Sequence, residues 1–287
     1  MEINTLTTSI VIPVYNEADS LYACLEAIAK LKTKPYEVIV VDNNSTDGSA
    51  EVAARFNWVT LVSEEKQGVV HARSRGFDEA NGDIIARIDA DTLLKPDWIN
   101  KIEAIFDADT NLAAVSGSSD YYDFHFKKLA NSIDRMARRY LEKRLKRHLF
   151  LFGSNMAIRQ TAWKDVRGDL CAISGIHEDL DLAIHLQEAG LKVAYNSQLV
   201  AGVSSRRVSS GFSNFIRYSL VSPRTYSSHG LKSHLHMYPV IFFLWMLYGP
   251  AHLIYLSYNP QNQAFSLRYL LQSRMKDARI DPTINVA

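Results

Sequence analysis

Short apolar runs alternate with amphipathic stretches over the first 120 residues, and the two periodicities predict strands and helices. The predicted strands are Ser9–Tyr15, Glu37–Asp42, Val59–Ser63, Asp83–Asp89 and Leu112–Ser116. The predicted helices are Glu17–Leu31, Ser45–Phe56, Gly68–Ala80 and Pro96–Phe106. Asn16 is expected to cap the first of these helices, and Ser45 or Thr46 the second. This alternation predicts βαβ units, and therefore an α/β fold with a mostly parallel sheet.

Polar side chains follow three of the predicted strands. In a parallel sheet, ligands bind outside the carboxyl ends of the strands. We therefore expect Tyr15–Glu17, Asp42–Ser45 and Asp89–Asp91 to converge, although they are far apart in the chain.

The second half of the chain contains a long basic helix, predicted over residues 127–148. Its apolar stripe comprises Leu129, Ile133, Met136, Tyr140, Leu141 and Leu145. Its opposite face carries Lys127, Lys128, Arg135, Arg138, Arg139, Lys143, Arg144, Lys146 and Arg147. A further helix is predicted to begin near Glu178 and to end at Gly190, a residue type that favours the end of a helix.

Residues 238–258 form an apolar segment of 21 residues without Asp, Glu, Lys or Arg. A helix of about 20 apolar residues crosses a bilayer core, and Tyr and Trp are frequent at membrane interfaces. Pro239, Gly249 and Pro250 are expected to kink this helix. Three interpretations stay open: a membrane span, a helix lying in the interface, and a buried core or dimer helix.

Composition places the chain among globular proteins. Of its 287 residues, 47% are hydrophobic and 22% charged, which excludes wholesale disorder, a collagen-like repeat and a disulfide scaffold. Its two cysteines, Cys24 and Cys171, form no CxxC pair for zinc or redox chemistry, and they fit a reducing cytoplasm. Residues 1–9 lack the pattern of a signal peptide, so none is expected.

Charge is distributed unevenly behind a net charge of +1. Residues 1–126 carry 10 basic and 21 acidic side chains, whereas residues 189–287 carry 10 basic and 2 acidic ones. This asymmetry suggests that the C-terminal half faces nucleic acid, anionic lipid or a phosphorylated ligand, or else that it is a solvated basic face.

A pair of carboxylates, Asp89 and Asp91, lies at the end of a predicted strand. Hard oxygen ligands in such a loop suit Mg²⁺ or Mn²⁺, which commonly shares its coordination with substrate phosphates. A lone Asp-x-Asp pair also occurs in loops and helix caps that have no metal.

Two further segments contain candidate binding or catalytic residues. Asp42 and Asn44, in Asp42–Gly48, can accept hydrogen bonds from a base or ribose, although the same residues favour a turn followed by a helix cap. Glu178 and Asp179 either complement a helix dipole or include a general base.

Several other site types lack their motifs. The chain has no GxxxxGK[ST], no GxGxxG after a strand and no GxSxG, which argues against a P-loop protein, a nicotinamide dehydrogenase and a hydrolase. The spacing of His229, His234 and His236 matches no zinc-binding helix.

Five segments occur together and in one order: Ile10–Glu17 (IVIPVYNE), Val38–Ser49 (VIVVDNNSTDGS), His71–Gly76 (HARSRG), Gly82–Asp91 (GDIIARIDAD) and His177–Leu180 (HEDL). In this combination they resemble a family 2 inverting glycosyltransferase over roughly residues 7–210. The resemblance implies a GT-A (Rossmann-like) fold that binds a nucleotide-diphosphate sugar and a divalent metal, Mg²⁺ or Mn²⁺. It also implies a glycosyltransferase domain over residues 1–210, with a nucleotide-binding half (1–120) and an acceptor half (121–210). Residues 211–287 would form a helical extension, in part membrane-associated.

The resemblance assigns roles to residues of the nucleotide-binding half. By this resemblance, the nucleoside pocket would be lined by Pro13, Tyr15, Glu17 and Asp42. Arg73 would lie near the base or the diphosphate, Asp89 would meet the ribose or the metal, and Asp91 would bind the metal.

The acceptor half matches the family less completely. Gly153, Ser154 and Asn155 match the small-residue stretch before the acceptor site, and Asp179 matches the catalytic base of the Glu-Asp motif, directly after Glu178. Arg206 and Arg207 lie where a basic loop would close on the diphosphate. Two departures are Asn43, where the family often has a second Asp, and the missing Gln-x-x-Arg-Trp motif of processive synthases, which argues against a polymerising enzyme.

The basic helix, the acid-poor C-terminal third and the apolar segment favour a position on the cytoplasmic side of a membrane, peripheral or single-span, and otherwise in the cytoplasm. The expected acceptor is then a lipid-linked molecule or a saccharide. Alternatives are a non-catalytic nucleotide-sugar-binding scaffold and a metal-dependent nucleotidyltransferase, for which Lys95 is the nearby phosphate-activating candidate. No nucleic-acid-binding motif is present, so a nucleic-acid partner is not expected.

Overall fold

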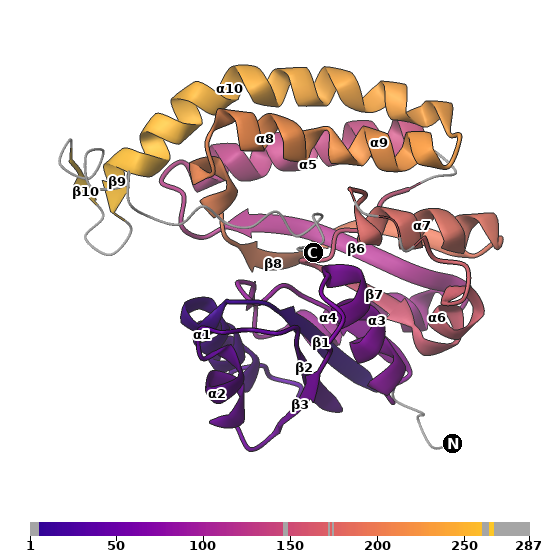
Figure 1. Ribbon diagram of the computed structural model, residues 1–287. Coiled ribbons are helices and arrows are strands. Elements are labelled where there is room, and N and C mark those ends of the chain that lie inside the picture. The colour runs from indigo at the N-terminus through magenta and orange to yellow at the C-terminus, as the bar shows by residue number, and fades with distance from the viewer. Residues whose placement is uncertain (1–5, 146–148, 172, 174, 260–263, 267–287) are drawn as a thin grey trace.

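The computed structural model describes residues 6–145, 149–171, 173, 175–259 and 264–266. The strands of its large sheet are β1 (Thr8–Val14), β2 (Glu37–Asp42), β3 (Val59–Ser63), β4 (Ile84–Arg87), β5 (Leu93–Leu94), β6 (Leu112–Tyr121), β7 (Met156–Arg159) and β8 (Lys192–Val203). The helices on the two faces of this sheet are α1 (Ala18–Ala29), α2 (Ser49–Ala54), α3 (Val69–Glu79), α4 (Trp98–Ala108), α6 (Gln160–Val166) and α7 (Glu178–Glu188). We call the sheet with these helices the sheet body (Figure 1).

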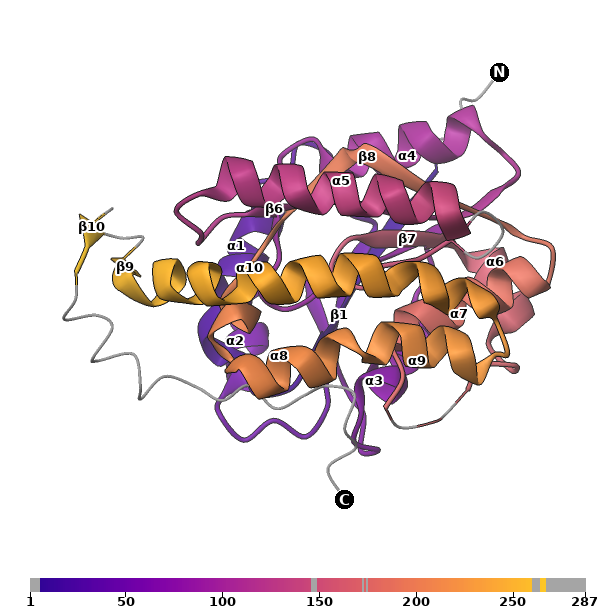
Figure 2. The ribbon, with the colours of Figure 1, turned by 90° about the horizontal axis from the view of Figure 1, so that it is seen from above.

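A separate layer of helices covers one side of the sheet body (Figure 1). It consists of α5 (Lys127–Leu145), α8 (Phe212–Ser219), α9 (Val221–Ser228) and α10 (Tyr238–Ser257), with the short 3-10 helices η1 (Arg206–Ser209) and η2 (Lys232–Met237). Seen from above, α10 runs between α5 on one side and α8 and α9 on the other (Figure 2). We call these elements the outer helical layer. A small hairpin of β9 (Tyr258–Asn259) and β10 (Ala264–Phe265) follows α10.

The strand order of the large sheet is β3-β2-β1-β4-β7-β6-β8-β5. From β3 to β4 every pair is parallel, as the βαβ pattern predicts. Beyond β4 the sheet is mixed, because β7 runs antiparallel to both β4 and β6, and β5 runs antiparallel to β8. The expected α/β fold is therefore confirmed, with a parallel half that carries the nucleotide motifs and a mixed half that follows it.

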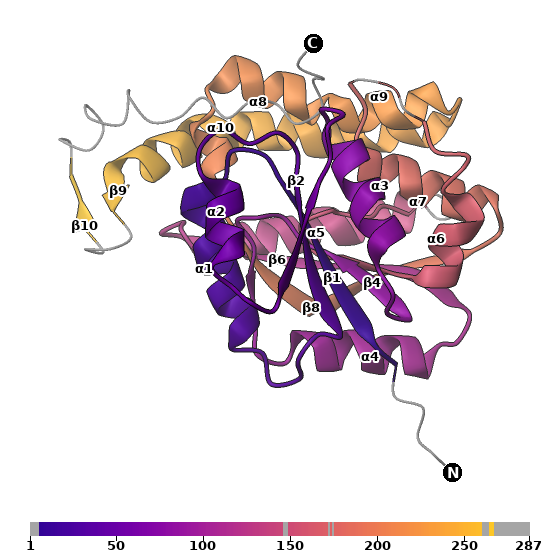
Figure 3. The same cartoon turned by 60° about the horizontal axis from the view of Figure 1, so that its bottom comes forward.

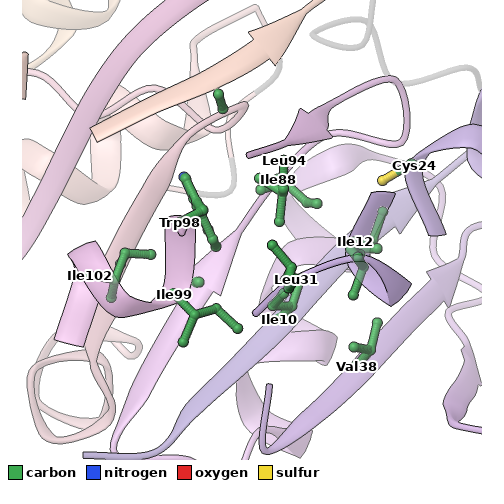
Figure 4. Close-up of a cluster of buried hydrophobic side chains, with 14 of the residues drawn as sticks. Ile10, Ile12, Cys24, Leu31, Val38, Ile88, Leu94, Trp98, Ile99 and Ile102 are labelled. Carbon is green, nitrogen blue, oxygen red and sulfur yellow. The ribbon is translucent and has the colours of Figure 1, made fainter. Parts of the chain in front are cut away.

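Alternate residues of the central strands supply two hydrophobic cores, since successive side chains of a strand point to opposite faces. Ile10 and Ile12 face a core formed with α1, α2 and α4, which includes Trp98 (Figure 4). Val11 faces a second core with α3, α6 and α7, which includes Trp163. Figure 3 shows α1 and α2 on one side of the strands, with α3, α6 and α7 on the other. Both faces of the parallel half are thus covered.

The outer helical layer meets the sheet body through a third, smaller core. Leu145 of α5, Tyr226 of α9 and Ile241 of α10 pack there with Leu180 and Ile184 of α7. This core attaches the C-terminal helices to α7, the helix that begins with the Glu-Asp pair.

The long helix α5 does not bury the apolar stripe that its sequence suggests. Leu129 and Met136 are exposed, although Leu145 is buried. Arg138, expected on the basic outer face, is also buried, and its guanidinium donates to Asp134, to the Gly117 carbonyl and to the Ser119 hydroxyl. This side chain turns inward because it meets polar groups of β6 there. The expected residues 146–148 of the helix, with Lys146 and Arg147, lie outside the described residues.

The predicted caps of the first two helices are wrong. Helix α1 begins after Glu17, and Asn16 adopts a left-handed φ of 52° in the preceding loop. Helix α2 begins only at Ser49, after Gly48 with a φ of 86°. Residues Ser45 and Thr46 therefore belong to a loop, where their polar atoms bond Asn16.

The apolar segment forms α10, a helix of 20 residues that continues through Pro250. It curves downward towards its C-terminal end, as Figure 1 shows. Together with η2 it makes a helical stretch, Lys232–Ser257, that is long and apolar enough to cross a membrane, and only 11% of its most apolar window is buried. Exposure of this extent argues against the buried-core interpretation.

Candidate functional site

The three polar segments meet at the carboxyl edge of the parallel half, as expected. β1 lies between β2 and β4, and Asp42 pairs with Val14 in the register. The Asn43 amide donates to the Val14 carbonyl at 2.8 Å, and the Ile88 amide donates to the Val11 carbonyl at 3.2 Å.

The loops after β1 and β2 hold each other in place. The Asn16 amide donates to Ser45 Oγ at 3.0 Å, and the Glu17 amide donates to Ser49 Oγ at 2.9 Å. Asn16 Oδ1 in turn accepts from the Thr46 amide at 2.8 Å. These bonds place Glu17 at the edge of the sheet beside the Asp42 loop.

In the loop that begins at Asp42, Asn43 and Asn44 form hydrogen bonds, whereas one carboxylate oxygen of Asp42 has no partner among the described groups. Asn43 donates to the Glu64 and Lys66 carbonyls and accepts from the Gly68 amide, so this departure from the family pattern fastens the loop that precedes α3. Asn44, with a φ of 65°, donates to the Glu65 carbonyl. Asp42 Oδ1 is buried without a hydrogen-bond partner among the described groups. A buried acceptor without a partner is costly, so it marks a place for a ligand donor.

Pro13 and Tyr15 are only partly buried on the same side of the sheet. They lie at and just beyond the end of β1, next to the Asp42 loop.

Arg206 joins Glu17, at the end of the loop after β1, to Asp91 of the carboxylate pair. Its Nη2 lies 2.6 Å from Glu17 Oε1 and 2.9 Å from Asp91 Oδ2. Burial lowers the pKa of Arg206, while Asp91 and Glu17 raise it, and the carboxylates prevail. The sequence separates these residues by more than a hundred positions, and the loop after β8 closes that distance.

Two residues without a predicted role hold this arrangement. Asp123 accepts from the Ser204 hydroxyl and from the Ser205 amide and hydroxyl, each at 2.7 Å, so it anchors the loop that presents Arg206. The Tyr122 hydroxyl donates to the Asp91 carbonyl at 3.1 Å. The sequence contained no motif signal for either residue.

Arg87 links the carboxylate pair to α7. It donates to Asp89 Oδ1 at 3.0 Å and forms an ion pair with Glu178 Oε1 at 2.9 Å, and its side chain is 6% exposed. No motif marks Arg87 as a site residue. Its position in an apolar strand could have identified it, because arginine is almost never buried unless it is paired.

Gly153 leaves the space that Arg87 occupies. A Cβ at Gly153 would lie 1.2 Å from Arg87 Nη1, so a larger residue would displace the guanidinium. The Gly153 amide also donates to Asp179 Oδ2 at 2.8 Å, and the Leu180 amide donates to Asp179 Oδ1 at 2.8 Å. The small-residue stretch and the Glu-Asp pair are therefore in direct contact.

Asp179 has the electrostatics of a base near neutral pH. Burial, and after it the neighbouring Glu178 carboxylate, raise the pKa of Asp179 to about 7, against the lowering effect of Arg87 and of the two amides. A carboxylate poised near the working pH is suited to take a proton.

Ser154 and Asn155 differ in burial, and so in whether a ligand can reach them. Ser154 is partly exposed, and its carbonyl accepts from Thr92. Asn155 is buried, donates to the Ser118 and Leu199 carbonyls and accepts from Trp98. This geometry gives Asn155 a structural role between strands.

Arg73 lies behind the site. It is fully buried near the rings of Phe77 and Trp163, and its Nη1 donates to the Glu178 carbonyl at 3.3 Å. Burial lowers the pKa of Arg73 to about 10. The hydrogen bond to Glu178 supports the start of α7.

Two other cations point elsewhere. The guanidinium of Arg207 lies over the Tyr218 ring, 3.3 Å from its centroid. Lys95 pairs with Asp120 at 3.2 Å, which weakens its candidacy as a phosphate-activating lysine.

The carboxylate pair fits a divalent cation. Asp91 is 4% exposed, and its carboxylate already neutralises a guanidinium, while the Asp89 side chain is one third exposed. Carboxylate oxygens at this edge are the ligands that Mg²⁺ and Mn²⁺ prefer.

Comparison with known proteins agrees with this geometry. The sequence model described as "Glycosyl transferase family 2" matches residues 9–167, more than half of the chain. The chain belongs to glycosyl transferase family 2. The match ends before Asp179 and Arg206, so the roles of these two residues rest on the site itself.

Curated relatives of this family 2 chain match over part of their length. The glycosyltransferase AglE of Haloferax volcanii is 30% identical over 55% of this chain and 54% of its own. The undecaprenyl-phosphate 4-deoxy-4-formamido-L-arabinose transferase of Yersinia enterocolitica is 37% identical over 34% of this chain and 32% of its own. The chain thus spans about half, or less, of the length of these relatives.

Solved structures share the fold at low sequence identity. The mannosyltransferase PcManGT of Pyrobaculum calidifontis, solved with GDP-Man and Mn²⁺, superposes with a TM-score of 0.64 at 20% identity, over 94% of this chain and 79% of its own. TarS of S. aureus, solved with UDP-GlcNAc, superposes with a TM-score of 0.53 at 13% identity, over 75% of this chain and 66% of its own.

Proposed function

We propose that this glycosyltransferase moves a sugar, with inversion, from a nucleotide-diphosphate sugar to a hydroxyl of a lipid-linked acceptor at a membrane surface. One observation carries the proposal. Ion pairs run from Glu17 through Arg206 to Asp91, and from Asp89 through Arg87 to Glu178, next to Asp179. This network connects the nucleotide loops, the carboxylate pair and a partly buried base at one edge of the sheet.

On the donor side, the residues at the ends of β1 and β2 bind the nucleoside. Asp42 offers its unpaired oxygen to a base or ribose donor, beside Pro13, Tyr15 and Glu17. Asp91 and Asp89 hold a divalent metal, which when bound supplies charge neutralisation for the leaving diphosphate. The mannosyltransferase solved with GDP-Man and Mn²⁺ shares this fold, which supports a nucleotide sugar and a divalent metal as the bound ligands.

On the acceptor side, Asp179 takes the proton of the attacking hydroxyl. The acceptor oxygen forms a bond to the anomeric carbon, the bond from that carbon to the diphosphate oxygen breaks, and the configuration inverts. Gly153 and Leu180 orient the Asp179 carboxylate through their amides. Arg206, once it leaves Asp91, pairs with the diphosphate as a preorganised cation.

The membrane position is supported by the outer helical layer. Phe242, Phe243, Met246 and Leu253 of α10 are exposed, and α5 carries most of its basic residues outward. Basic residues near an anionic leaflet gain about 1 kcal/mol each. Relatives named as undecaprenyl-phosphate sugar transferases favour a lipid acceptor, and we place the protein on the cytoplasmic side of the membrane. Residues 1–210 then form the catalytic domain and residues 211–287 its membrane-associated extension.

Nucleotide binding with and without metal tests the donor site. Thermal unfolding is measured with UDP, GDP and dTDP, each with and without Mn²⁺, on the wild type, on Asp91→Ala and on the exposed control Asp107→Ala. A ligand at about 100 times its Kd adds about 2.7 kcal/mol of stability. We expect one nucleotide to stabilise the wild type and the control only with metal, and to leave Asp91→Ala unchanged. Equal metal-independent stabilisation of all three proteins would contradict the metal assignment, and no stabilisation by any nucleotide would contradict the donor site.

A further inference from the structure

A second group of metal-ligating side chains lies away from the carboxylate pair, where α7 meets α9. Its members are Cys171, Asp181, His185 and His229, and their ligand atoms all lie within 4.8 Å of one another. Asp181 and His185 lie one turn apart on α7, Cys171 lies in the loop before α7, and His229 caps the end of α9. Three segments therefore converge on this point.

The distances are close to those of a coordination shell. His229 Nε2 lies 2.9 Å from Asp181 Oδ1, and His185 Nε2 lies 3.6 Å from both Asp181 Oδ1 and Cys171 Sγ. A tetrahedral zinc site with bonds of about 2.0–2.3 Å separates its ligand atoms by about 3.3–3.8 Å. Small side-chain shifts are enough to reach that geometry.

Burial and charge at the cluster favour a cation. The Asp181 side chain is fully buried, and the His229 side chain is 8% exposed. Glu188 Oε2 lies 3.8 Å from His185 Nδ1, on the side of the ring away from the cluster. A carboxylate behind a ligating imidazole is the usual arrangement that orients a histidine towards a metal.

We propose that Cys171, Asp181, His185 and His229 bind one Zn²⁺ ion. One sulfur, two nitrogens and one carboxylate oxygen suit zinc, which accepts all three donor types in tetrahedral sites. Four protein ligands leave no open position, so the site is structural. A metal here differs from the one at Asp91, which has hard oxygen ligands only.

The ion would fasten the outer helical layer to the helix that carries the catalytic base. The same two helices are already linked through the His177 amide, which donates to Thr225 Oγ1 at 2.9 Å, and through Tyr226 in the third core. Asp179 and Asp181 are two residues apart on α7, so they point to different sides of the helix. Zinc at Asp181 thus fixes α7 against α9 without occupying the acceptor side.

The chemistry of Cys171 disagrees with a redox nucleophile. Burial, and after it the carboxylate of Asp181, raise the pKa of this thiol to about 11. A free thiol with that pKa is unreactive at neutral pH, whereas metal binding displaces its proton.

Zinc content and cobalt spectra of the full chain test the site. The protein, in detergent, is stripped with a chelator, dialysed without nucleotide and titrated with Zn²⁺ or with Co²⁺ as a spectroscopic probe. Cys171→Ser and His229→Gln are compared with the wild type and with His236→Gln, which removes a nearby imidazole outside the cluster. Both substitutions leave the fully buried Asp181 in place.

We expect one zinc per chain in the wild type and in His236→Gln, with a rise in Tm on zinc addition. Cys171→Ser should lose the thiolate-to-cobalt charge-transfer band, and both cluster variants should bind zinc at least tenfold more weakly. Zinc binding by Cys171→Ser and His229→Gln with wild-type affinity would overturn the proposal, as would no zinc binding by the wild type. The second result would leave Asp181 and His229 as a plain buried hydrogen-bonded pair.

Discussion

The sheet body and the outer helical layer solve the same problem, the burial of apolar surface, in different ways. The parallel half of the sheet body has helices on both faces, and large side chains such as Trp98 and Trp163 are buried in the two cores. In the outer layer, Phe242 and Met246 are 63% and 66% exposed, and Leu129 and Met136 of α5 are exposed as well. The outer layer therefore keeps apolar surface that the other described residues do not cover.

Charge divides the two regions in the same way. Four acidic residues at the carboxyl edge of the sheet, Glu17, Asp89, Asp91 and Glu178, are paired with Arg87 or Arg206 inside the molecule. No Asp or Glu occurs from Ala189 to Lys276, the stretch that supplies most of the outer layer. The proposed chemistry therefore belongs to the region with two closed cores, and the exposed apolar side chains belong to the other region. Arg206, between β8 and α8, connects the two.

The largest expected effect is confined to the sheet body. Asp179→Asn keeps the shape of the side chain but cannot accept a proton, so the rate of sugar transfer should fall about 10³-fold. Nucleotide binding should stay at the wild-type level, because we assign Asp179 to the acceptor and not to the nucleotide. Transfer kinetics and nucleotide-dependent thermal shifts measure the two properties separately.

Asp165→Asn, an exposed change on α6, is the matched control and should behave as the wild type. Near-normal turnover in Asp179→Asn would show that the base lies elsewhere. Loss of nucleotide binding in the same variant would mean that the substitution disturbs the site as a whole.

Much of the sheet body could be predicted from the sequence because its elements are local and strongly periodic. The strand Glu37–Asp42 was predicted at its observed bounds, and the convergence of the loops follows from parallel topology. The antiparallel insertion of β7 was not predicted, because it depends on long-range pairing with β4 and β6. The start of α2 at Ser49 was missed because Ser45 and Thr46, good capping residues, bond Asn16 instead.

The site was predictable where a motif exists and missed where function depends on tertiary contacts. Asp89, Asp91 and Asp179 stand in recognisable motifs, although their roles remain proposals. Arg87 and Asp123 act through partners about 90 and 80 residues away, which no local pattern reveals. The cluster of Cys171, Asp181, His185 and His229 has no local sequence signal for the same reason: the partners of His229 lie on α7 and in the loop before it.

The second prediction tests the connection between the regions. Arg206→Ala removes the cation that bridges Glu17 and Asp91, and loss of one preorganised donor to the diphosphate should lower kcat about 10²-fold. Without Arg206, Asp91 is no longer paired with its guanidinium, so Mn²⁺ alone should stabilise the variant more than the wild type. Steady-state kinetics and metal-dependent Tm values measure these changes.

Arg207→Ala is the matched control, since Arg207 lies over Tyr218 and not at the carboxylates. It should change kcat by less than about threefold, because it removes no group that we place on the diphosphate. Equal losses in both variants would indicate that the loop acts only through its general positive charge.

The third prediction concerns pH. Because the pKa of Asp179 is raised to about 7, the ionised base becomes available as pH rises, and the transfer rate should increase about tenfold between pH 6 and pH 8. Stability should move the other way. Between the unfolded pKa near 3.8 and the folded pKa, the folded state binds more protons, so the free energy of unfolding falls as pH rises.

Asp179→Asn lacks this titration. Its Tm relative to the wild type should therefore rise from pH 5 to pH 8, while the same difference for Asp165→Asn stays flat. A wild-type rate that does not depend on pH between 6 and 8 would remove Asp179 as the titrating base.

The smallest effect on transfer is expected from the outer layer. Phe242→Ser/Met246→Ser makes the exposed face of α10 polar without touching the core, because both side chains are already exposed. Interfacial binding scales with the apolar area that enters the membrane, so binding to anionic vesicles should weaken, and transfer to a lipid-borne acceptor should slow about fivefold. Vesicle flotation and transfer assays on lipid-borne and soluble acceptors measure this.

Tyr36→Ser/Leu61→Ser, two exposed apolar residues of the sheet body, provide the control and should leave vesicle binding unchanged. The soluble acceptor separates the roles of the two regions, because transfer to it requires the candidate site but no membrane binding. If the α10 variant slows transfer to the soluble acceptor as much as to the lipid-borne one, α10 shapes the catalytic site itself, and the division of labour between the two regions is wrong.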